Sequence, residues 1–347
     1  MSKMMEEIRE QPEALERTLR LGLKPAAGLA REIAKKRPKL IILAARGTSD
    51  NAAQLGRYLL EITTGIPVSL AAPSLYTLYN AKLNLKEAII VAISQSGEST
   101  DTNLVLERAR EQGALTVGIT NEPKSSLAKL AGHVFLVRTK RERSVAATKT
   151  YTGQVMLLYL LAQALGAKIR IDDLKRVPDW TANALELEPE ITARAERYRF
   201  MERAIVVGRG LNYANAFEFA LKMMETCYVV AERFSTADFL HGPIAMVERS
   251  FPMFLFTPSG VTWEGMRDMI GRLEALKAET LIFTDRSNKE AIASNPRAIV
   301  IPARLPAELY TPIPYVIPAQ IFAASLAAWK GIDPDRPRTL SKVTRTL

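Results

Sequence analysis

The chain has 347 residues, of which 48% are hydrophobic and 24% charged, and its formal net charge is +10. This length predicts two domains rather than one, and the composition is ordinary for a globular protein with a large core. One cysteine and two histidines exclude an internal disulfide, a thiolate zinc cluster and a histidine-rich metal site. The positive charge favours anionic partners, namely nucleic acid, membrane lipid or phosphorylated metabolites.

The N-terminal sequence MSKMMEEIREQPEALERTLR is polar and helix-forming, and it contains no apolar signal-peptide region. No apolar run approaches the roughly 18 residues of a membrane span, so we expect a cytoplasmic protein without membrane contact. Basic runs at 35–39 (KKRPK) and 138–143 (RTKRER) adjoin predicted strands. They carry no helix-turn-helix, zinc-finger or aromatic-rich RNA signature, and we therefore expect no nucleic-acid binding.

Short apolar runs rich in isoleucine and valine form two matching series. The first series is LIILAARG (40–47), AIIVAIS (88–94), LTVGIT (115–120) and HVFLV (133–137), and the second is RAIVVGRG (203–210), PMFLFTPSG (252–260), TLIFTD (280–285) and AIVIPA (298–303). Ala88 and Leu115 are 27 residues apart, as are Met253 and Thr280, and the next interval is 18 residues in both series. The preserved spacings predict a duplicated domain.

Each run is apolar on both faces, which is typical of buried parallel strands. Helical segments alternate with the runs, for example 100–113 in the first series and 263–279 in the second. The alternation predicts an α/β fold of two tandem doubly wound parallel-sheet domains, flavodoxin-like or Rossmann-like, with right-handed crossovers. We expect an N-terminal helical segment, a first domain, a helical connector, a second domain and a C-terminal tail, at residues 1–27, 28–170, 171–198, 199–334 and 335–347.

Two loops of the first series are rich in hydroxyl groups, RGTSDN (46–51) after the first strand and SQSGES (94–99) after the second. Ligands of such sheets bind beyond the carboxyl ends of the strands, and helix N-termini attract anions. Serine and threonine in these loops could serve only as helix caps, but their corresponding sheet positions favour a phosphate site. The second series has RGLNYA and TPSGVT there, with fewer hydroxyls, so we expect one phosphate site per chain. Without a GxGxxG or Walker motif, neither a dinucleotide nor ATP is favoured.

At GTS (47–49), SQSGES (94–99) and SVAATKT (144–150) the sequence resembles the sugar isomerase (SIS) domain family. The tandem arrangement resembles the isomerase half of glutamine:fructose-6-phosphate amidotransferase and, more closely, the stand-alone double-SIS glucosamine-6-phosphate deaminases. The resemblance runs from MEEIREQPEAL (5–15) through LKMMET (221–226) and HGP (241–243) to the C-terminal DRPRTLSKVTRTL (335–347). It implies an enzyme without cofactor or metal, and a homodimer with shared active sites.

The resemblance also implies the roles of individual residues. The 6-phosphate would be bound by five side chains, Ser49, Ser94, Gln95, Ser96 and Ser99. Thr48 and Gly97 would shape these loops, and Val145 and Glu218 would contact the sugar. The run SVAATK departs from the amidotransferase-like GVASTK at Ser144 and Ala147, which leaves the exact sugar open.

Chemistry is expected from the second half and the tail. Glu218, Lys222 and Glu225 share one helical face at spacings of four and three residues, which alone could be a surface salt-bridge row. The resemblance makes Glu225 the base that moves a proton between C1 and C2, and Lys222 its cationic neighbour. It makes His241, on a predicted loop, the acid or base for ring opening, reaching into a partner subunit.

Lys342 in the tail would meet the open-chain carbonyl, under a tail that orders on substrate binding. We expect His133, at the start of an apolar strand, and Cys227 to be structural residues.

The expected reaction converts glucosamine-6-phosphate and water to fructose-6-phosphate and ammonia. The chain begins MSKMMEE, without the N-terminal cysteine of a glutaminase, so glutamine is not expected as the nitrogen source. The alternatives are an aminating isomerase that uses free ammonia, and another phosphosugar isomerase or a deglycase. A third alternative, outside enzymes, is a regulatory module that binds a sugar phosphate. Such a sensor would need the phosphate loops but not Glu225, His241 and Lys342.

Overall fold

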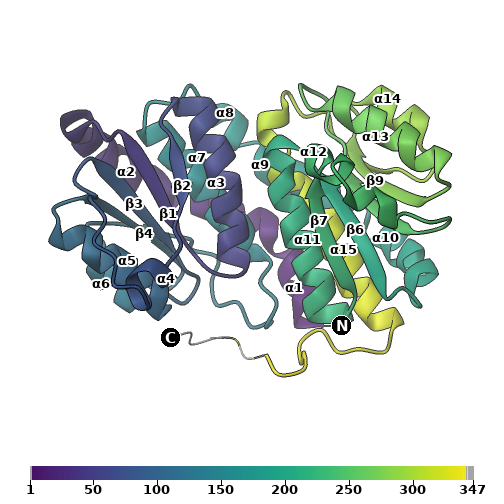
Figure 1. Cartoon of the computed structure of the whole chain (residues 1–347), viewed down its shortest axis with the longest axis horizontal. Coiled ribbons are helices and arrows are strands. Elements are labelled where there is room, and N and C mark those ends of the chain that lie inside the picture. Colours follow the sequence, from purple (N-terminus) through teal and green to yellow (C-terminus); the bar gives the residue numbers. More distant parts are fainter. Residues whose placement is uncertain (1, 341, 343–347) are drawn as a thin grey trace. The chain divides into compact units, whose positions relative to one another are not determined.

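The computed structural model describes residues 2–340 and 342. Packing divides them into two compact units, each containing one series of strands. The first-repeat unit comprises residues 13–143, 147–175, 340 and 342, and the second-repeat unit comprises residues 2–12, 144–146 and 176–339. Figure 1 shows the first-repeat unit mainly in purple to teal and the second-repeat unit mainly in green to yellow.

Each unit contains one five-stranded sheet in which every paired strand is parallel. The order is β2-β1-β3-β4-β5 in the first repeat and β7-β6-β8-β9-β10 in the second, so the two sheets have the same topology. This order, 2-1-3-4-5, is that of the flavodoxin-like doubly wound fold. The predicted duplication and fold class are therefore confirmed. The strands are β1 (Leu40–Ala44), β2 (Val68–Leu70), β3 (Ala88–Ile93), β4 (Leu115–Thr120), β5 (His133–Leu136), β6 (Arg203–Gly208), β7 (Val230–Ser235), β8 (Pro252–Phe256), β9 (Glu279–Asp285) and β10 (Ile299–Ile301).

Two strands, β2 and β7, are absent from the predicted series. Both lie at a sheet edge, where each pairs with one neighbour only among the described strands. Strand β2 has three residues, and β7 carries the adjacent charged residues Glu232 and Arg233. A search for runs that are apolar on both faces therefore misses these two strands, although it finds β5 and β10, which also lie at sheet edges.

Helices cover both faces of the first-repeat sheet (Figure 1). On one face, Ile42 and Ile90 pack with Val105 and Leu127, which belong to the α5 and α6 helices. On the other face α3 lies against β1 and α7, with Gly56 allowing a close approach because a Cβ there would meet Leu43. The helices of this unit are α2 (Gln11–Lys36), α3 (Thr48–Thr64), α4 (Ser74–Thr77), α5 (Thr100–Glu111), α6 (Ser126–Leu130), α7 (Lys149–Ala164) and α8 (Ile171–Leu174).

An aromatic cluster fills one face of the second-repeat sheet. Phe219 lies within 5.2 to 5.7 Å of Phe254, Phe283 and Phe322 between ring centroids, in edge-to-face contacts. The opposite face is packed by methionines of α13, including Met266. The helices of this unit are α1 (Lys3–Arg9), α9 (Val177–Leu185), α10 (Glu188–Ala195), α11 (Tyr213–Cys227), α12 (Thr236–Leu240), α13 (Trp263–Ala275), α14 (Lys289–Ser294) and α15 (Pro312–Trp329), with 3-10 turns η1 (Glu196–Tyr198), η2 (Gly210–Asn212), η3 (Pro243–Met246) and η4 (Glu308–Tyr310).

Helix α15 corrects the expectation that no apolar run approaches the length of a membrane span. It has 18 residues with a mean hydropathy of 1.2, and 89% of this stretch is buried inside the protein. Side chains all round it are buried because it packs against α11 on one side and α9 and α10 on another. Its length and composition would permit a membrane crossing, but its burial is that of the core helix of an α/β domain.

Candidate active site

The two hydroxyl-rich loops leave neighbouring strands at the same edge of the first-repeat sheet. Strands β1 and β3 pair in register up to Ala44 and Ala92, so the loops that follow them start side by side. Helix α3 begins at Thr48, within the predicted loop 46–51, so Ser49 lies in its first turn, whereas α5 begins at Thr100, directly after the second loop. The chain order reverses between β1 and β3, which is where doubly wound sheets bind ligands.

Gly97 determines the shape of the SQSGES loop. Its φ is +67°, and a Cβ there would lie 2.2 Å from the Ser125 hydroxyl, so only glycine fits. Its N–H donates to the Ser94 hydroxyl at 3.1 Å, and its carbonyl accepts from the Leu127 N–H and the Asn103 side-chain amide. The loop is therefore held by its own hydrogen bonds without a ligand.

The predicted phosphate-binding residues cluster around these two loops. Ser49 and Ser94 are buried, and the Ser49 hydroxyl accepts a hydrogen bond from the Gln154 amide of α7 at 2.9 Å. The Ser99 hydroxyl lies 3.0 Å from that of Thr102 in the first turn of α5. All seven predicted residues follow the carboxyl ends of the neighbouring strands β1 and β3 in the first-repeat sheet. They are Thr48, Ser49, Ser94, Gln95, Ser96, Gly97 and Ser99.

A salt bridge that the sequence did not predict joins the two loops. The Arg46 guanidinium, after β1, contacts the Asp101 carboxylate in the first turn of α5, with Nη2 to Oδ2 at 2.9 Å and Nε to Oδ2 at 3.2 Å. Asp101 is buried, whereas Arg46 is half exposed. Nearby, burial raises the pKa of Asp50, an effect that Arg46 opposes. The bridge ties the loop after β1 to the start of α5, and Asp101 balances the charge of the Arg46 guanidinium.

Lys342 belongs to the first-repeat unit, where its Nζ lies 3.4 Å from Oε2 of Glu142. The same oxygen accepts a hydrogen bond from the Gln95 side-chain amide at 2.9 Å. The Glu142 carboxylate is fully buried. A residue absent from the sequence prediction thus contacts both a predicted phosphate-binding residue and the predicted tail lysine. Only the position of Glu142 before SVAATK could have suggested it.

In the second-repeat unit, α11 brings Glu218, Lys222 and Glu225 together. The Lys222 Nζ lies 2.6 Å from Glu225 Oε2 and 3.5 Å from Glu218 Oε1. The side chains of Lys222 and Glu218 are 0% exposed and that of Glu225 is 24% exposed. A surface salt-bridge row is therefore excluded. The structure thus places a buried lysine between two carboxylates, one of which reaches solvent.

Val145 and His241 also fall in the second-repeat unit. His241 lies on a loop, as predicted: it is the C-cap residue of α12, its N–H donates to the Asp238 carbonyl, and its side chain is exposed. Val145 is partly exposed. Val145 and His241 thus belong to a different unit from the phosphate loops.

His133 and Cys227 have structural surroundings. His133 Nε2 contacts the Glu32 carboxylate. The Cys227 thiol donates to the Ala323 carbonyl at 3.1 Å, and burial raises its pKa to about 11. Within residues 2–340 and 342, no three His, Cys, Asp or Glu side chains group as metal ligands.

The loops of the second repeat that correspond to the phosphate loops contain a carboxylate of the protein. Glu308 accepts hydrogen bonds from the N–H and hydroxyl of Thr262, at 3.3 and 2.9 Å, just before α13. A Cβ at Gly260 would lie 2.6 Å from Glu308 Oε2 and one at Gly210 3.4 Å from Oε1, so this carboxylate lies between the two loops. Burial raises the pKa of Glu308. The second repeat thus places its own anion where the first has hydroxyl groups.

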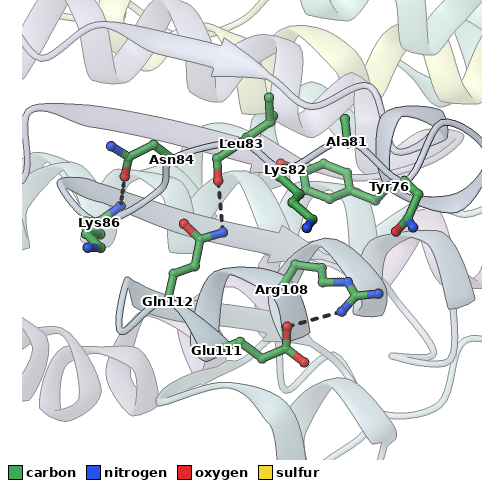
Figure 2. Close-up of a pocket in the computed structure, with 10 residues that line it drawn as sticks. Tyr76, Ala81, Lys82, Leu83, Asn84, Lys86, Arg108, Glu111 and Gln112 are labelled. Carbon is green, nitrogen blue, oxygen red and sulfur yellow. Dashed lines mark hydrogen bonds and ion pairs between the residues drawn. The ribbon is translucent and has the colours of Figure 1, made fainter.

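Figure 2 shows a cavity of about 610 Å³ in the first-repeat unit. It lies beside the segment before β3 and the end of α5, where the Gln112 amide donates to the Leu83 carbonyl at 2.9 Å. Lys86 lies before β3 and Ser94 after it, so this cavity is at the opposite end of the strand from the phosphate loops. It is separate from the candidate active site.

Comparison with known proteins identifies relatives over nearly the whole chain. The SIS domain model matches residues 32–164 and 199–330. Glutamine–fructose-6-phosphate aminotransferase (isomerizing) of Pyrococcus horikoshii is 33% identical over 345 residues, which are 98% of this chain and 57% of that protein. This chain therefore spans little more than half of that relative.

Two solved structures are similar throughout. The C-terminal domain of glucosamine-fructose-6-phosphate aminotransferase from Francisella tularensis has a TM-score of 0.88 and 28% identity, covering 97% of this chain and 98% of that domain. Glucosamine-6-phosphate deaminase from Thermotoga maritima has a TM-score of 0.76 and 21% identity, covering 99% of this chain and 100% of that one. The second likeness shows the shared fold alone.

Proposed function

Because the chain belongs to the SIS domain family and has two SIS repeats, we propose that it is a phosphosugar isomerase acting on a sugar 6-phosphate. The observation that carries the proposal is the pair of buried Lys222 and partly exposed Glu225 at 2.6 Å, next to buried Glu218. A sugar-phosphate sensor needs an anion site but has no use for a buried lysine between carboxylates, whose desolvation is costly. That pair favours an enzyme over a binding module.

The proposed mechanism divides binding from proton transfer. Hydroxyl and backbone N–H groups of the loops after β1 and β3 bind the 6-phosphate. His241 moves the proton that opens the sugar ring, and the Glu225 carboxylate takes the proton from one of the carbons C1 and C2. The electrons of the C–H bond form a C=C bond between the two carbons while the carbonyl oxygen takes up a proton, which gives an enediol or enaminol. The proton on Glu225 then moves to the other carbon while the hydroxyl or amino group on the first carbon gives up its proton and becomes the carbonyl or imine, which completes the change between aldose and ketose.

Lys222 pairs with the Glu225 carboxylate at 2.6 Å and holds it in place. Lys342 interacts with the open-chain carbonyl. The remaining sugar contacts are proposed for Val145 and Glu218.

The finer proposal is deamination of glucosamine-6-phosphate. Proton transfer from C2 to C1 converts the amino aldose to an imine at C2, and water releases ammonia and leaves fructose-6-phosphate. What supports it is the two-repeat fold, which this chain shares over its full length with the glucosamine-6-phosphate deaminase of Thermotoga maritima. The amidotransferase relatives make the reverse, aminating direction a second candidate. Plain phosphosugar isomerisation or deglycation is a third.

The test is to incubate the purified protein with glucosamine-6-phosphate and to measure ammonia and fructose-6-phosphate together. Equal amounts of the two products support the deaminase, and Glu225→Gln should abolish them. Isomerisation of glucose-6-phosphate without ammonia release from the amino sugar would support another phosphosugar isomerase instead. Binding of sugar phosphates without any turnover would contradict the enzyme and favour the sensor.

The C-terminal tail offers a second test. Removal of the last six residues, which include Lys342, should abolish turnover while the melting temperature stays close to that of the full chain. Full activity after the deletion would remove Lys342 from the mechanism. We further propose that the protein works in the cytoplasm as a homodimer whose active sites receive His241 from the neighbouring subunit.

A further inference from the structure

Glu142 is a buried carboxylate whose two oxygens have different partners. Its Oε1 accepts hydrogen bonds from the backbone N–H groups of Thr148 and Thr150, at 2.8 and 3.2 Å, and from the Thr148 hydroxyl at 3.3 Å. Its Oε2 is contacted by the Gln95 amide at 2.9 Å and by the Lys342 ammonium at 3.4 Å. One oxygen thus faces the backbone at the start of α7, and the other faces two residues of the proposed mechanism.

The Oε1 contacts have a structural purpose. Thr148 and Thr150 are at the N-terminus of α7, whose first backbone N–H groups have no partner within the helix. A carboxylate there satisfies them and interacts favourably with the helix dipole. This accounts for a buried acid at this point, but not for the contacts of the other oxygen.

The Oε2 contacts connect parts of the chain that are far apart in sequence. Gln95 lies in the loop after β3, whereas Lys342 lies 200 residues beyond Glu142 in the C-terminal tail. The side chain of Lys342 is 27% exposed, so its ammonium is largely removed from water beside a fully buried carboxylate. A charged hydrogen-bond acceptor in such surroundings fixes both donors more strongly than a neutral one.

We propose that Glu142 is a positioning residue that holds the tail lysine and the phosphate-loop glutamine through one oxygen. This rests on the proposed function, because it assigns Glu142 to the same site. Glu142 does not react with the sugar. It directs the Gln95 amide and holds the Lys342 ammonium near the phosphate loops.

The two oxygens make Glu142→Gln an informative variant. The glutamine carbonyl can still accept from the α7 backbone, but its NH2 group cannot accept from Gln95 or Lys342. We expect the melting temperature to stay near that of wild type. Turnover number should fall by on the order of 10²-fold, as for a displaced catalytic group, and KM should rise several-fold because Gln95 is no longer directed. Glu87→Gln, at an exposed ion pair with Lys39, is the matched control.

A double variant distinguishes an effect of Glu142 that acts through Lys342 from a general loss of activity. If Glu142 acts on turnover number through Lys342, then Glu142→Gln should lower it little further in a chain that already carries Lys342→Met. Equal fold-losses in both backgrounds would overturn the proposal. Wild-type turnover number and stability in Glu142→Gln would overturn it as well.

The effect of Glu142 on Lys342 can be measured without substrate, as the rate of proteolytic cleavage after Lys342. Trypsin cleaves after Lys342, and intact-mass spectrometry follows the shortened chain. We expect cleavage several-fold faster in Glu142→Gln than in wild type and Glu87→Gln. Equal rates would refute the positioning role even if the enzyme is active. An inactive wild type with the expected difference in cleavage would refute the proposed function but would still support the role of Glu142 in holding Lys342.

Discussion

Replacing Lys222 with leucine should destabilise the second-repeat unit strongly, because it leaves Glu218 buried without its ammonium neighbour. Both side chains are 0% exposed, so the pair lies in the interior, where solvent does not screen it. Removing one partner of a buried ion pair typically costs about 3–5 kcal/mol. At 2–4 °C per kcal/mol for a unit of this size, the melting temperature should fall by roughly 6–20 °C.

The first repeat suggests the compensating change. Gly47 and Gly210, after β1 and β6, are 163 residues apart, and the same interval places Leu55 and Leu59 of α3 at the positions of Glu218 and Lys222. Both leucines are completely buried. The fold therefore accepts an apolar pair here, and the double variant Glu218→Leu/Lys222→Leu should recover most of the lost stability while remaining inactive.

Differential scanning calorimetry and circular dichroism of the second-repeat transition would measure these effects. Lys175→Leu, which removes an exposed pair with Asp172, should change stability by less than about 1 kcal/mol. The reasoning would be refuted if Lys222→Leu melted with the wild type, or if the double leucine variant melted no higher than the single one.

Three further predictions concern other groups. Burial raises the pKa of Glu308 in the folded chain, so the free energy of unfolding should fall as the pH rises from the pKa of the unfolded chain through the raised pKa of the folded chain. In urea melts over a pH series, Glu308→Gln should reduce this fall. An unchanged pH dependence would contradict the prediction. Because burial raises the pKa of Cys227 to about 11, the native thiol should not react with a disulfide reagent at pH 8 but should react fully in urea, and rapid native labelling would show it accessible. Mixed heterodimers of inactive Glu225→Gln and His241→Ala chains should recover part of the activity, whereas verified heterodimers without activity would place both groups in one subunit's site.

Periodicity and spacing predicted eight of the ten described strands, including the edge strands β5 and β10, and missed β2 and β7. Runs that are apolar on both faces identified β1 and β3, but β7, with consecutive Glu232 and Arg233, gives no such run. The sequence pattern did not predict helix α15, because its prolines at 312, 314 and 318 suggest a break. The first two of these prolines lie in its first turn, where proline is tolerated. An interior proline is accepted at 318 because packing on all sides supplies the stability.

The candidate site divides in the same way. Hydroxyl-rich loops and the i, i+3 and i, i+4 spacing on α11 are local patterns that drew attention to these segments, and the resemblance to the SIS family then singled out the phosphate-loop residues and Lys222 with its carboxylates. Glu142, Arg46 and Glu308 act through partners 200, 55 and 46 residues away, so no local pattern reveals them. Their surroundings exist only after the chain has folded.

The duplicated fold shows how the two repeats have specialised. The first repeat keeps hydroxyl groups in the loops after β1 and β3 and has leucines at the buried positions of α3. The second has ionisable groups at those positions of α11, and the carboxylate of Glu308 lies between its corresponding loops. An anion entering these loops would meet that negative charge, which disfavours a second phosphate there. We therefore predict that each chain binds one sugar phosphate, in the loops of the first repeat.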